Sequence, residues 1–295
     1  LPDEFVDLCY IDPPFFSQKH YEVIFGDGEE RRSFEDRWKG GIENYIDWMR
    51  VRVEEIHRLL KPTGTFYIHC DWHASHYLKV MCDDVFGHQN FRNEIVWHYR
   101  RWTAVSGAFQ RMHDVILFYT KGDHYVFNPL PILPTKSQQE VIERGWNVNV
   151  VKEKDKKVRQ LLVYDKGKME EAVQKGEIKL SNYDRVVYRD IRTTTANDVW
   201  TDIQYLHSQA KERYGYPTQK PEALLEIIIQ VSSNPWDLVF DCFCACGTTL
   251  TAAHKLTRRW VGIDVSPTGC KLVQYRLYKL GVRAEIIGLP RTIEE

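Results

Sequence analysis

FVDLCYI at residues 5–11 runs directly into DPPF at residues 12–15. The first segment is mainly apolar and rich in aromatic and β-branched residues, which predicts a buried strand of a parallel sheet. Ligands of open α/β sheets bind at the carboxyl ends of strands, so the residues after this strand are candidates for a site. Two prolines fix the backbone, and the Asp12 carboxylate and the Pro13 carbonyl then form two acceptors that suit an –NH2 group. Phe15 is placed to stack on a base, although the motif alone also fits an ordinary Asp-Pro turn closed by a core Phe.

Six further runs of the same character extend the predicted sheet. They lie at residues 65–69 (TFYIH), 94–99 (EIVWHY), 115–120 (VILFYT), 238–241 (LVFD), 260–264 (WVGID) and 284–287 (AEII). Segments with helical periodicity lie between them, at about 42–60, 74–86, 222–231, 248–257 and 267–280. This alternation predicts an α/β fold with a doubly wound, Rossmann-like sheet, seven-stranded and mostly parallel, with helices on both faces.

Residues 129–195 interrupt this alternation, because they are polar and Lys-rich and their apolar residues are scattered. A long irregular stretch inside an α/β chain is usually functional or a small separate domain. Basic residues are concentrated nearby: residues 92–195 carry 19 Lys and Arg against 13 Asp and Glu, whereas residues 1–91 carry 10 against 17. We therefore expect an insertion at 129–195 between a first part, 1–128, and a second part, 196–295, and any phosphate backbone to be met in the middle of the chain.

A second motif, DCFCACGTT at residues 241–249, also follows a predicted strand and opens a predicted helix. Small residues at 245 and 247 let the backbone come close to a ligand, and the helix start offers free N–H groups. The strand at 260–264 ends in Asp264, placed like the acid that binds ribose hydroxyls in nucleotide-binding folds. A third motif, TQKPE at 218–222, precedes another helix, where Pro221 suits the first turn and Lys220 could meet a ligand carboxylate.

The three motifs resemble those of the amino-methyltransferases that modify DNA. Their order along the chain is similar to the permuted β group of these enzymes, which belong to restriction-modification systems. The resemblance implies a site-specific DNA (adenine-N6) methyltransferase that depends on S-adenosyl-L-methionine (AdoMet). Residues 1–128 would form the catalytic half, 129–195 the target-recognition region, and 196–295 the AdoMet-binding half of the same domain.

The resemblance also implies roles for individual residues. Asp12 and the Pro13 carbonyl would hold the target amine beside Pro14, and Phe15 would stack on a base flipped out of double-stranded DNA. Contacts to AdoMet are implied for Asp241, Phe243, Cys244, Ala245, Gly247, Thr248, Thr249, Asp264, Val265, Thr218, Lys220 and Pro221. Asp264 would bond the ribose, and Thr218 and Lys220 would lie near the methionine end. Ala245 replaces a usual Gly, which puts the closeness of cofactor approach in doubt.

DNA contacts are expected where basic and aromatic residues interleave at 97–102 (WHYRRW) and in the loop that follows. The candidates are Arg100, Arg101, Trp102 and Arg111, which could reach phosphates or base edges. Part of this segment also fits a strand with one buried face.

Three alternative functions remain open from the sequence. The first is N4 methylation of cytosine, for which the family more often has Ser before the two prolines. The second is methylation of an RNA or a protein amine, where Asn is more usual at position 12. The third is a catalytically inactive homologue that keeps the fold and binds nucleic acid.

Composition limits the remaining properties of the chain. Seven Cys without a regular framework indicate reduced thiols, and no apolar run is long enough to span a bilayer, so a cytoplasmic protein with no membrane contact is expected. HCDWH at 69–73 lacks the separated ligand pairs of zinc sites, so no metal is expected. The family resemblance leaves a restriction endonuclease subunit or fused domain, and a homodimer, as open partner hypotheses.

Overall fold

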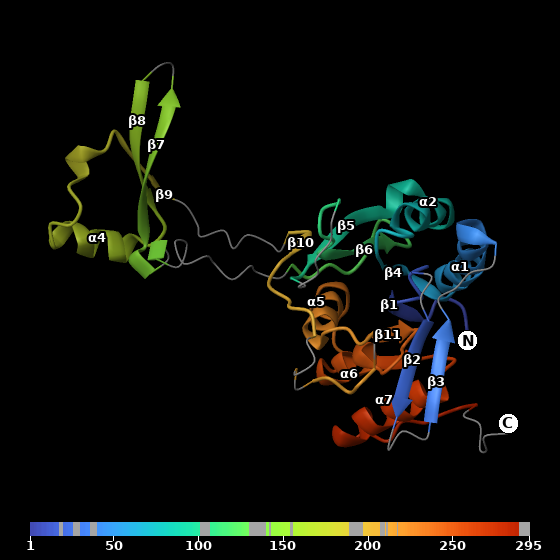
Figure 1. Cartoon of the computed structure of the whole chain (residues 1–295). Helices are drawn as coiled ribbons and strands as arrows, with labels where there is room; N and C mark the ends of the chain where they lie inside the picture. The colour runs from blue at the N-terminus through green and yellow to red at the C-terminus, as the bar shows by residue number, and fades with distance from the viewer. Residues whose placement is uncertain are drawn as a thin grey trace. The chain divides into compact units, whose positions relative to one another are not determined.

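The structure is a computed structural model that describes the chain except for residues 18–19, 26–29, 36–39, 101–106, 130–139, 142, 154–155, 189–196, 207–209, 211, 217 and 289–295. For residues 20–25 and 30–35 it describes the backbone. The chain divides into two compact units, one formed by Leu1–Asn128 with Asn197–Glu295 and the other by Pro129–Ala196 (Figure 1). None of the described helices is both long and apolar enough to cross a membrane.

A seven-stranded sheet is the centre of the larger unit, among the residues that the structure describes. Its strands, in spatial order, are β10 (Val199–Trp200), β5 (Phe91–His98), β6 (His113–Thr120), β4 (Leu60–Cys70), β1 (Val6–Ile11), β11 (Leu238–Asp241) and β12 (Arg259–Gly262). All neighbouring pairs are parallel except those that β6 makes with β4 and β5. The predicted α/β fold with a mostly parallel seven-stranded sheet is therefore confirmed.

Two details of the predicted sheet were wrong. β6 was expected to be parallel, but it is antiparallel to both neighbours, and the described part of residues 99–112 contains no crossover helix of the kind that a parallel return needs. Residues 284–287 form no strand and pair with none of the sheet strands. Ala284 packs against the apolar cluster of Leu250 and Leu277 instead, and Ile287 is 89% exposed. The seventh strand is β10, whose two residues pair with β5.

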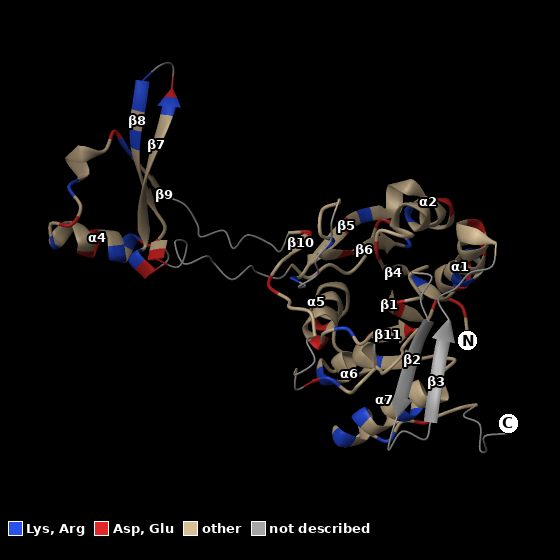
Figure 2. Cartoon of the chain, viewed as in Figure 1, with Lys and Arg blue, Asp and Glu red and all other residues tan. Residues whose placement is uncertain are grey.

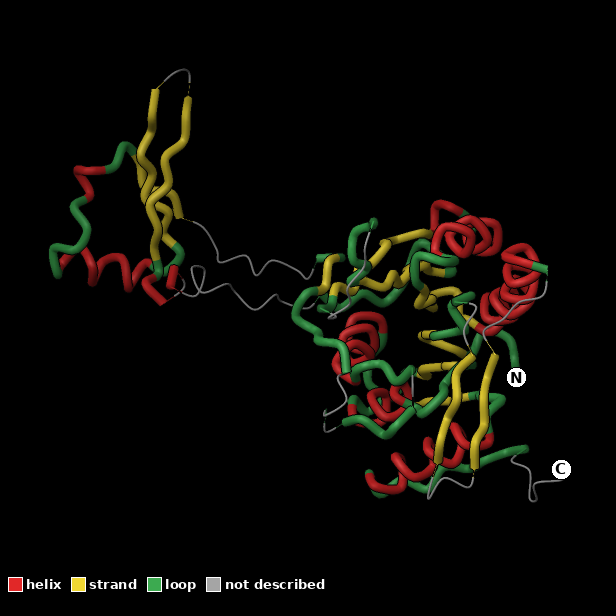
Figure 3. Tube along the Cα trace, viewed as in Figure 1, coloured by secondary structure: helices red, strands yellow, loops and turns green. Residues whose placement is uncertain are grey.

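Helices cover both faces of the sheet (Figure 3). α1 (Gly41–Leu59) and α2 (Ser75–Phe86) pack on one face, and α5 (Glu222–Ser232) and α6 (Thr248–Lys255) pack on the other. α7 (Pro267–Lys279) packs against the loop before α6. Pro221 is the N-cap of α5, one position before the first turn that the sequence suggested.

β1 shows how the two layers are built from one strand. Cys9 and Ile11 belong to the core beneath α1 and α2, whereas Leu8 and Tyr10 belong to the core beneath α5 and α6. Successive side chains of a strand point to opposite faces, so a strand buried on both sides must be apolar nearly throughout. The carboxyl end of this doubly buried strand is thereby fixed, and Asp12 follows it directly.

The smaller unit has its own core. It contains β7 (Trp146–Glu153), β8 (Lys156–Val163), α4 (Lys166–Gln174), the short helix η2 (Leu180–Asn182) and β9 (Arg185–Tyr188). Buried side chains of β8 and α4, including Leu161 and Met169, form its apolar cluster. Figure 2 colours basic residues blue near the turn end of the β7–β8 hairpin, where Lys152 is opposite Lys157.

Three small elements of the larger unit lie outside the seven-stranded sheet. β2 (His20–Phe25) and β3 (Glu30–Glu35) form an antiparallel pair after the DPPF motif, and η1 (His88–Asn90) joins α2 to β5.

Candidate functional site

Three carboxylates of the predicted motifs meet at one edge of the sheet. Asp12 follows β1, Asp241 ends β11 and Asp264 follows β12, and these three strands are successive parallel neighbours. The negative charges of Asp12 and Asp264 both act on Asp241 and raise its pKa, after the larger effect of burial. The carboxyl edge of the sheet therefore brings together the motifs predicted to be catalytic and cofactor-binding, as the topology of an open α/β sheet requires.

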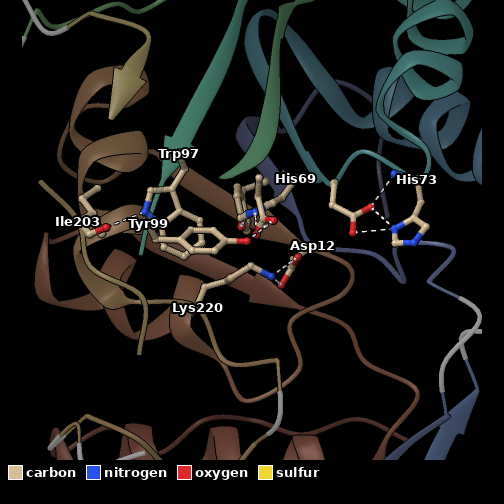
Figure 4. A network of polar contacts seen from close by, with 10 residues as sticks. Asp12, His69, His73, Trp97, Tyr99, Ile203 and Lys220 are labelled. Atoms are coloured by element: carbon tan, nitrogen blue, oxygen red, sulfur yellow. Dashed lines mark hydrogen bonds and ion pairs between the residues drawn. The ribbon is translucent and has the colours of Figure 1, made fainter. Parts of the chain in front are cut away.

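Asp12 forms an ion pair with Lys220 (Figure 4). The Lys220 Nζ lies 2.7 Å from each carboxylate oxygen, and the side chains of Lys220 and Asp12 are only 10% and 15% exposed, respectively. The resemblance implied that Lys220 lies near the methionine end of a cofactor, and the structure directs its ammonium to Asp12 of the DPPF motif. Removal of either partner would leave a mostly buried charge without its counterion.

Phe15 lies between charged and aromatic groups. Its ring stacks on His69, with centroids 5.5 Å apart, and the Lys220 Nζ lies 4.7 Å from the ring centroid. The neighbouring Pro14 carbonyl accepts a hydrogen bond of 2.7 Å from the Tyr45 hydroxyl on α1. Pro13 is buried, so the whole motif is held in place from several sides.

A buried series of hydrogen bonds holds the ring of His69. The sequence motifs did not predict these contacts. The His69 Nδ1 is 2.8 Å from the Tyr10 hydroxyl, and its Nε2 is 3.2 Å from Asp114, which also accepts a hydrogen bond from Tyr99 (Figure 4). Burial would raise the pKa of Asp114, but the hydrogen bond and charge of His69, with Lys220 and Tyr99, lower it to about 2. His69 and Asp114 are polar residues within otherwise apolar strands, which is the sequence signal that could have revealed them.

The loop between β11 and α6 is closed by the Asp241 carboxylate. It accepts a hydrogen bond of 3.0 Å from the Phe243 N–H and one of 2.6 Å from the Thr249 hydroxyl. Burial raises the pKa of Asp241 to about 7, although these two hydrogen bonds act in the opposite direction. Asp241 therefore acts first as a structural tie between the two ends of this loop.

Asp264 holds the middle of the same loop. Its carboxylate accepts hydrogen bonds from the backbone N–H groups of Ala245, at 2.7 Å, and Ser266, at 2.8 Å. Ala245 has φ 47°, in the left-handed region that favours glycine, the residue that the resemblance implies at this position. Each carboxylate oxygen retains acceptor capacity, so the half-buried Asp264 can still bind vicinal hydroxyl groups.

The remaining predicted cofactor residues differ in what their side chains contact. Cys244 is buried against Leu250, Thr248 accepts a hydrogen bond of 3.1 Å from Arg276, and Val265 is 97% exposed. Gly247 has φ 77° and caps α6, Pro221 is buried as the cap of α5, and Thr218 is half-buried.

The sequence did not predict the role of Arg276, because no local pattern distinguishes a buried arginine on α7 from an exposed one. It is 2% exposed, donates to the Cys246 carbonyl at 2.9 Å and lies 4.0 Å from Glu222 on α5. It therefore links the loop before α6 to the helix that follows Lys220.

Close packing between α7 and the loop gives a testable prediction at Gly269. A Cβ on this residue would lie 2.7 Å from the Ala245 carbonyl oxygen, so the loop and the helix would have to separate. We expect Gly269→Ala to lower the free energy of unfolding by about 1–3 kcal/mol, as overpacking does, and to weaken AdoMet binding. Urea denaturation and calorimetry measure these effects. Gly167→Ala is the control, because its Cβ would make only ordinary contact, with Asp165; equal effects of both variants would contradict the prediction.

The predicted DNA contacts are only partly described. Arg100 is exposed just beyond β5, and the Arg111 guanidinium lies 3.8 Å from the centroid of the Trp72 ring. Arg101 and Trp102 lie outside the described residues.

The HCDWH segment uses its side chains for hydrogen bonds. His69 belongs to the buried series of hydrogen bonds described above, and the His73 Nδ1 lies 2.8 Å from Asp71. In the part of the chain that the structure describes, no group of three or more His, Cys, Asp or Glu side chains is arranged to hold a metal ion.

The donor set of the 241–249 loop and Asp264 fits AdoMet. The loop approaches α7 closely enough to exclude a Cβ at Gly269, its backbone at Ala245 is left-handed, and Asp264 supplies acceptors for ribose hydroxyls. A glycine-containing loop between a strand and a helix, beside an acidic residue at the end of the next strand, is typical of nucleotide-binding α/β folds.

Residues 6–275 match the sequence model of a family described as DNA methylase (N6_N4_Mtase). The type II methyltransferase M.EcaI of Enterobacter cloacae is 29% identical and covers 91% of this chain, which spans 64% of the relative's length. The DNA adenine methyltransferase YhdJ of Escherichia coli (strain K12) is 28% identical, over 94% of this chain and 78% of the relative.

Two solved structures share the fold. M1.HpyAVI in complex with SAM matches with a TM-score of 0.51 and 16% identity, over 93% of this chain and 89% of the other. The PvuII DNA methyltransferase, described as cytosine-N4-specific, matches with a TM-score of 0.56 and 15% identity, over 97% and 83%.

Proposed function

Because the chain belongs to the DNA methylase family of N6 and N4 methyltransferases, we propose that it methylates the exocyclic N6 of adenine in double-stranded DNA, with AdoMet as donor. The observation that carries the proposal is the position of Asp12. Asp12 follows β1 at the carboxyl edge of the sheet and forms an ion pair with Lys220. The 241–249 loop and Asp264 lie at the same edge.

The chemistry needs positioning more than a covalent intermediate. An exocyclic amine is a poor nucleophile because its lone pair is delocalised into the ring. Hydrogen bonds from its two N–H groups to the Asp12 carboxylate and the Pro13 carbonyl would favour a more tetrahedral nitrogen with a directed lone pair. AdoMet, when bound, supplies an electrophilic methyl group on sulfur. The amine nitrogen would bond to this methyl carbon while the carbon–sulfur bond breaks and the sulfur keeps its electron pair, and the proton that the nitrogen loses would pass to solvent water.

Lys220 fixes the orientation of this carboxylate. Both Asp12 oxygens accept from its ammonium, yet a carboxylate oxygen has a further lone pair, so Asp12 can accept from the amine as well. We assign Lys220 to this positioning role in addition to any contact with the cofactor.

The target base must leave the duplex before its amine can reach Asp12. Phe15 is half-buried and rests on His69, so its ring is held rather than free to rotate. We propose that this ring stacks on the flipped base. The Tyr10–His69–Asp114–Tyr99 chain would act through Phe15 by fixing the ring beneath it.

The cofactor residues follow from the loop geometry. Asp264 would bind the ribose hydroxyls, and the backbone around Phe243, Ala245 and Gly247 would surround the nucleoside. Two accessible residues, Val265 and Thr218, would contact the cofactor as it enters. The buried residues would hold the loop and helices around it; they are Cys244, Thr248, Thr249 and Pro221.

DNA would meet the chain in two regions. Arg100 and Arg111 lie at the catalytic edge, and we propose that they bind phosphates there. We also propose that the Pro129–Ala196 unit recognises the target sequence. Its β7–β8 hairpin supports this role, because Lys152, Lys156 and Lys157 gather at its turn end.

N4 methylation of cytosine is the second candidate. The PvuII enzyme with the same fold is described as cytosine-N4-specific, so the fold does not decide between the two amines. Asp12 favours adenine, since the resemblance associates Ser at this position with cytosine.

Labelled AdoMet and unmethylated plasmid DNA test the function directly. We expect label in DNA, and N6-methyladenine as the modified nucleoside in mass spectrometry. Finding N4-methylcytosine would overturn the choice of base. Label in RNA or protein, with none in DNA, would overturn the substrate class.

A further inference from the structure

Phe109 is the most exposed of the large apolar side chains that the structure describes, at 98%. It precedes β6, and because β6 is antiparallel to β4, the start of β6 lies where β4 ends. Cys70 at the end of β4 is opposite Val115, and β4 is the parallel neighbour of β1. The segment that carries Phe109 therefore reaches the same edge of the sheet as the DPPF motif.

This segment is anchored two residues later. The Arg111 guanidinium lies 3.8 Å from the centroid of the Trp72 ring, and Trp72 lies 3.8 Å from the ring of His73, which is bound to Asp71. A planar guanidinium on an aromatic face is held in orientation and keeps its N–H donors available. Arg111 is exposed, and the ion pairs among the described residues join Asp71 to His73 and Asp114 to His69 but join no carboxylate to Arg111, so its charge is available to an external anion.

The two features together suit one partner. Covering an exposed aromatic ring with an apolar surface removes it from water and stabilises the complex. A neighbouring cation without a counterion favours an anionic partner. A DNA duplex opened at the target site offers both, because the gap left by an extruded base is bounded by base faces and lies close to phosphates.

We propose that Phe109 inserts into the DNA stack where the target base has left it, while Arg111, held on Trp72, binds a neighbouring phosphate. This inference rests on the proposed function, since it concerns the same DNA at the same site. Phe109 lowers the cost of base extrusion, and its contribution is largest when the target base is paired.

The test compares paired DNA with DNA in which the target adenine is opposite an abasic position. The methylated site is first identified with the wild-type protein. On paired DNA, we expect Phe109→Ala to lower turnover by about ten- to a hundredfold, in line with a base-extrusion cost of a few kcal/mol. On the abasic duplex, turnover should return to near the wild-type value. Phe109→Leu should keep most of the activity, and Tyr278→Ala, which removes a 67% exposed aromatic ring from α7, is the matched control.

A second measurement distinguishes the contribution of Arg111 to DNA binding from that of Phe109. Arg111→Gln and Trp72→Ala should weaken DNA binding and make its salt dependence shallower by about one phosphate contact. Fluorescence of 2-aminopurine at the target position should show less extruded base with Phe109→Ala.

The outcomes distinguish this inference from the proposed function. Equal loss of turnover on paired and abasic DNA, or no loss on either, would overturn insertion by Phe109 while leaving methyl transfer intact. Absence of methyl transfer by the wild-type protein on any DNA would overturn the proposed function itself.

Discussion

Replacement of Asp12 with alanine is expected to lower methyl transfer to DNA by about a hundred- to a thousandfold, the usual effect of removing one positioned transition-state contact. AdoMet binding should persist, because the hydrogen bonds of Asp241 and Asp264 that close the cofactor loop do not involve Asp12. Single-turnover assays with labelled AdoMet measure the first effect, and calorimetry measures the second. Turnover near that of the wild type would refute the role proposed for Asp12.

Because Asp12 is paired with Lys220, a loss of activity in Asp12→Ala needs a control for lost stability. Asp12→Ala leaves the Lys220 ammonium, which is 10% exposed, without its counterion, and this costs stability as well as activity. Asp12→Asn keeps the shape and one acceptor oxygen, and Lys220→Met removes the unpaired charge. We expect the double variant Asp12→Asn with Lys220→Met to melt near the wild-type temperature and to remain inactive. Recovery of activity in the double variant would show that the loss came from misfolding.

A strong pH dependence of stability is expected from Asp241. Burial raises the pKa of its carboxyl to about 7, whereas the same group in the unfolded chain titrates near about 4. The folded state therefore binds this proton more tightly than the unfolded state does. Its contribution to the free energy of unfolding is fully present below about pH 4 and is lost as the pH rises through about 7. Between pH 5 and pH 8 the loss would be at most about 3 kcal/mol.

Asp241→Asn isolates this contribution. The amide is neutral at every pH and its oxygen can still accept from the Phe243 N–H. Glu212, whose pKa burial also raises, titrates in both proteins and cancels in the difference. Asp264 titrates in both as well, but its charge acts on Asp241, so the difference includes the coupling between these two carboxylates. We expect urea denaturation at pH 5 and pH 8 to show a smaller change for Asp241→Asn than for the wild type. Parallel pH profiles of the two proteins would contradict the elevated pKa.

Much of the fold could be predicted from local patterns. The apolar runs that became β1, β4, β5 and β11, and the periodic segments that became the helices, were identified because burial on one or two faces leaves a period of 2 or 3.6 in the sequence. Residues 284–287 show the limit of this reasoning. They have the composition of a strand, but Ile287 remains in solvent because nothing in a four-residue pattern specifies a partner strand.

The candidate site was predictable in its motifs and not in its contacts. Asp12, Asp241 and Asp264 were identified because each follows a predicted strand, and the carboxyl ends of parallel strands meet at one edge. The partner of Asp12 was not, because Lys220 is 208 residues away and its motif suggested only a ligand carboxylate.

The sequence alone determined where the strands, the helices and the DPPF and cofactor motifs lie, since hydrophobic period and turn chemistry act over a few residues. Tertiary structure decided the direction of β6, the pairing of Lys220 with Asp12 and the buried chain from Tyr10 through His69 to Asp114. These features depend on which surfaces meet after the chain has folded. A local pattern can require that a side chain be buried or bonded, but only packing between distant segments selects its partner.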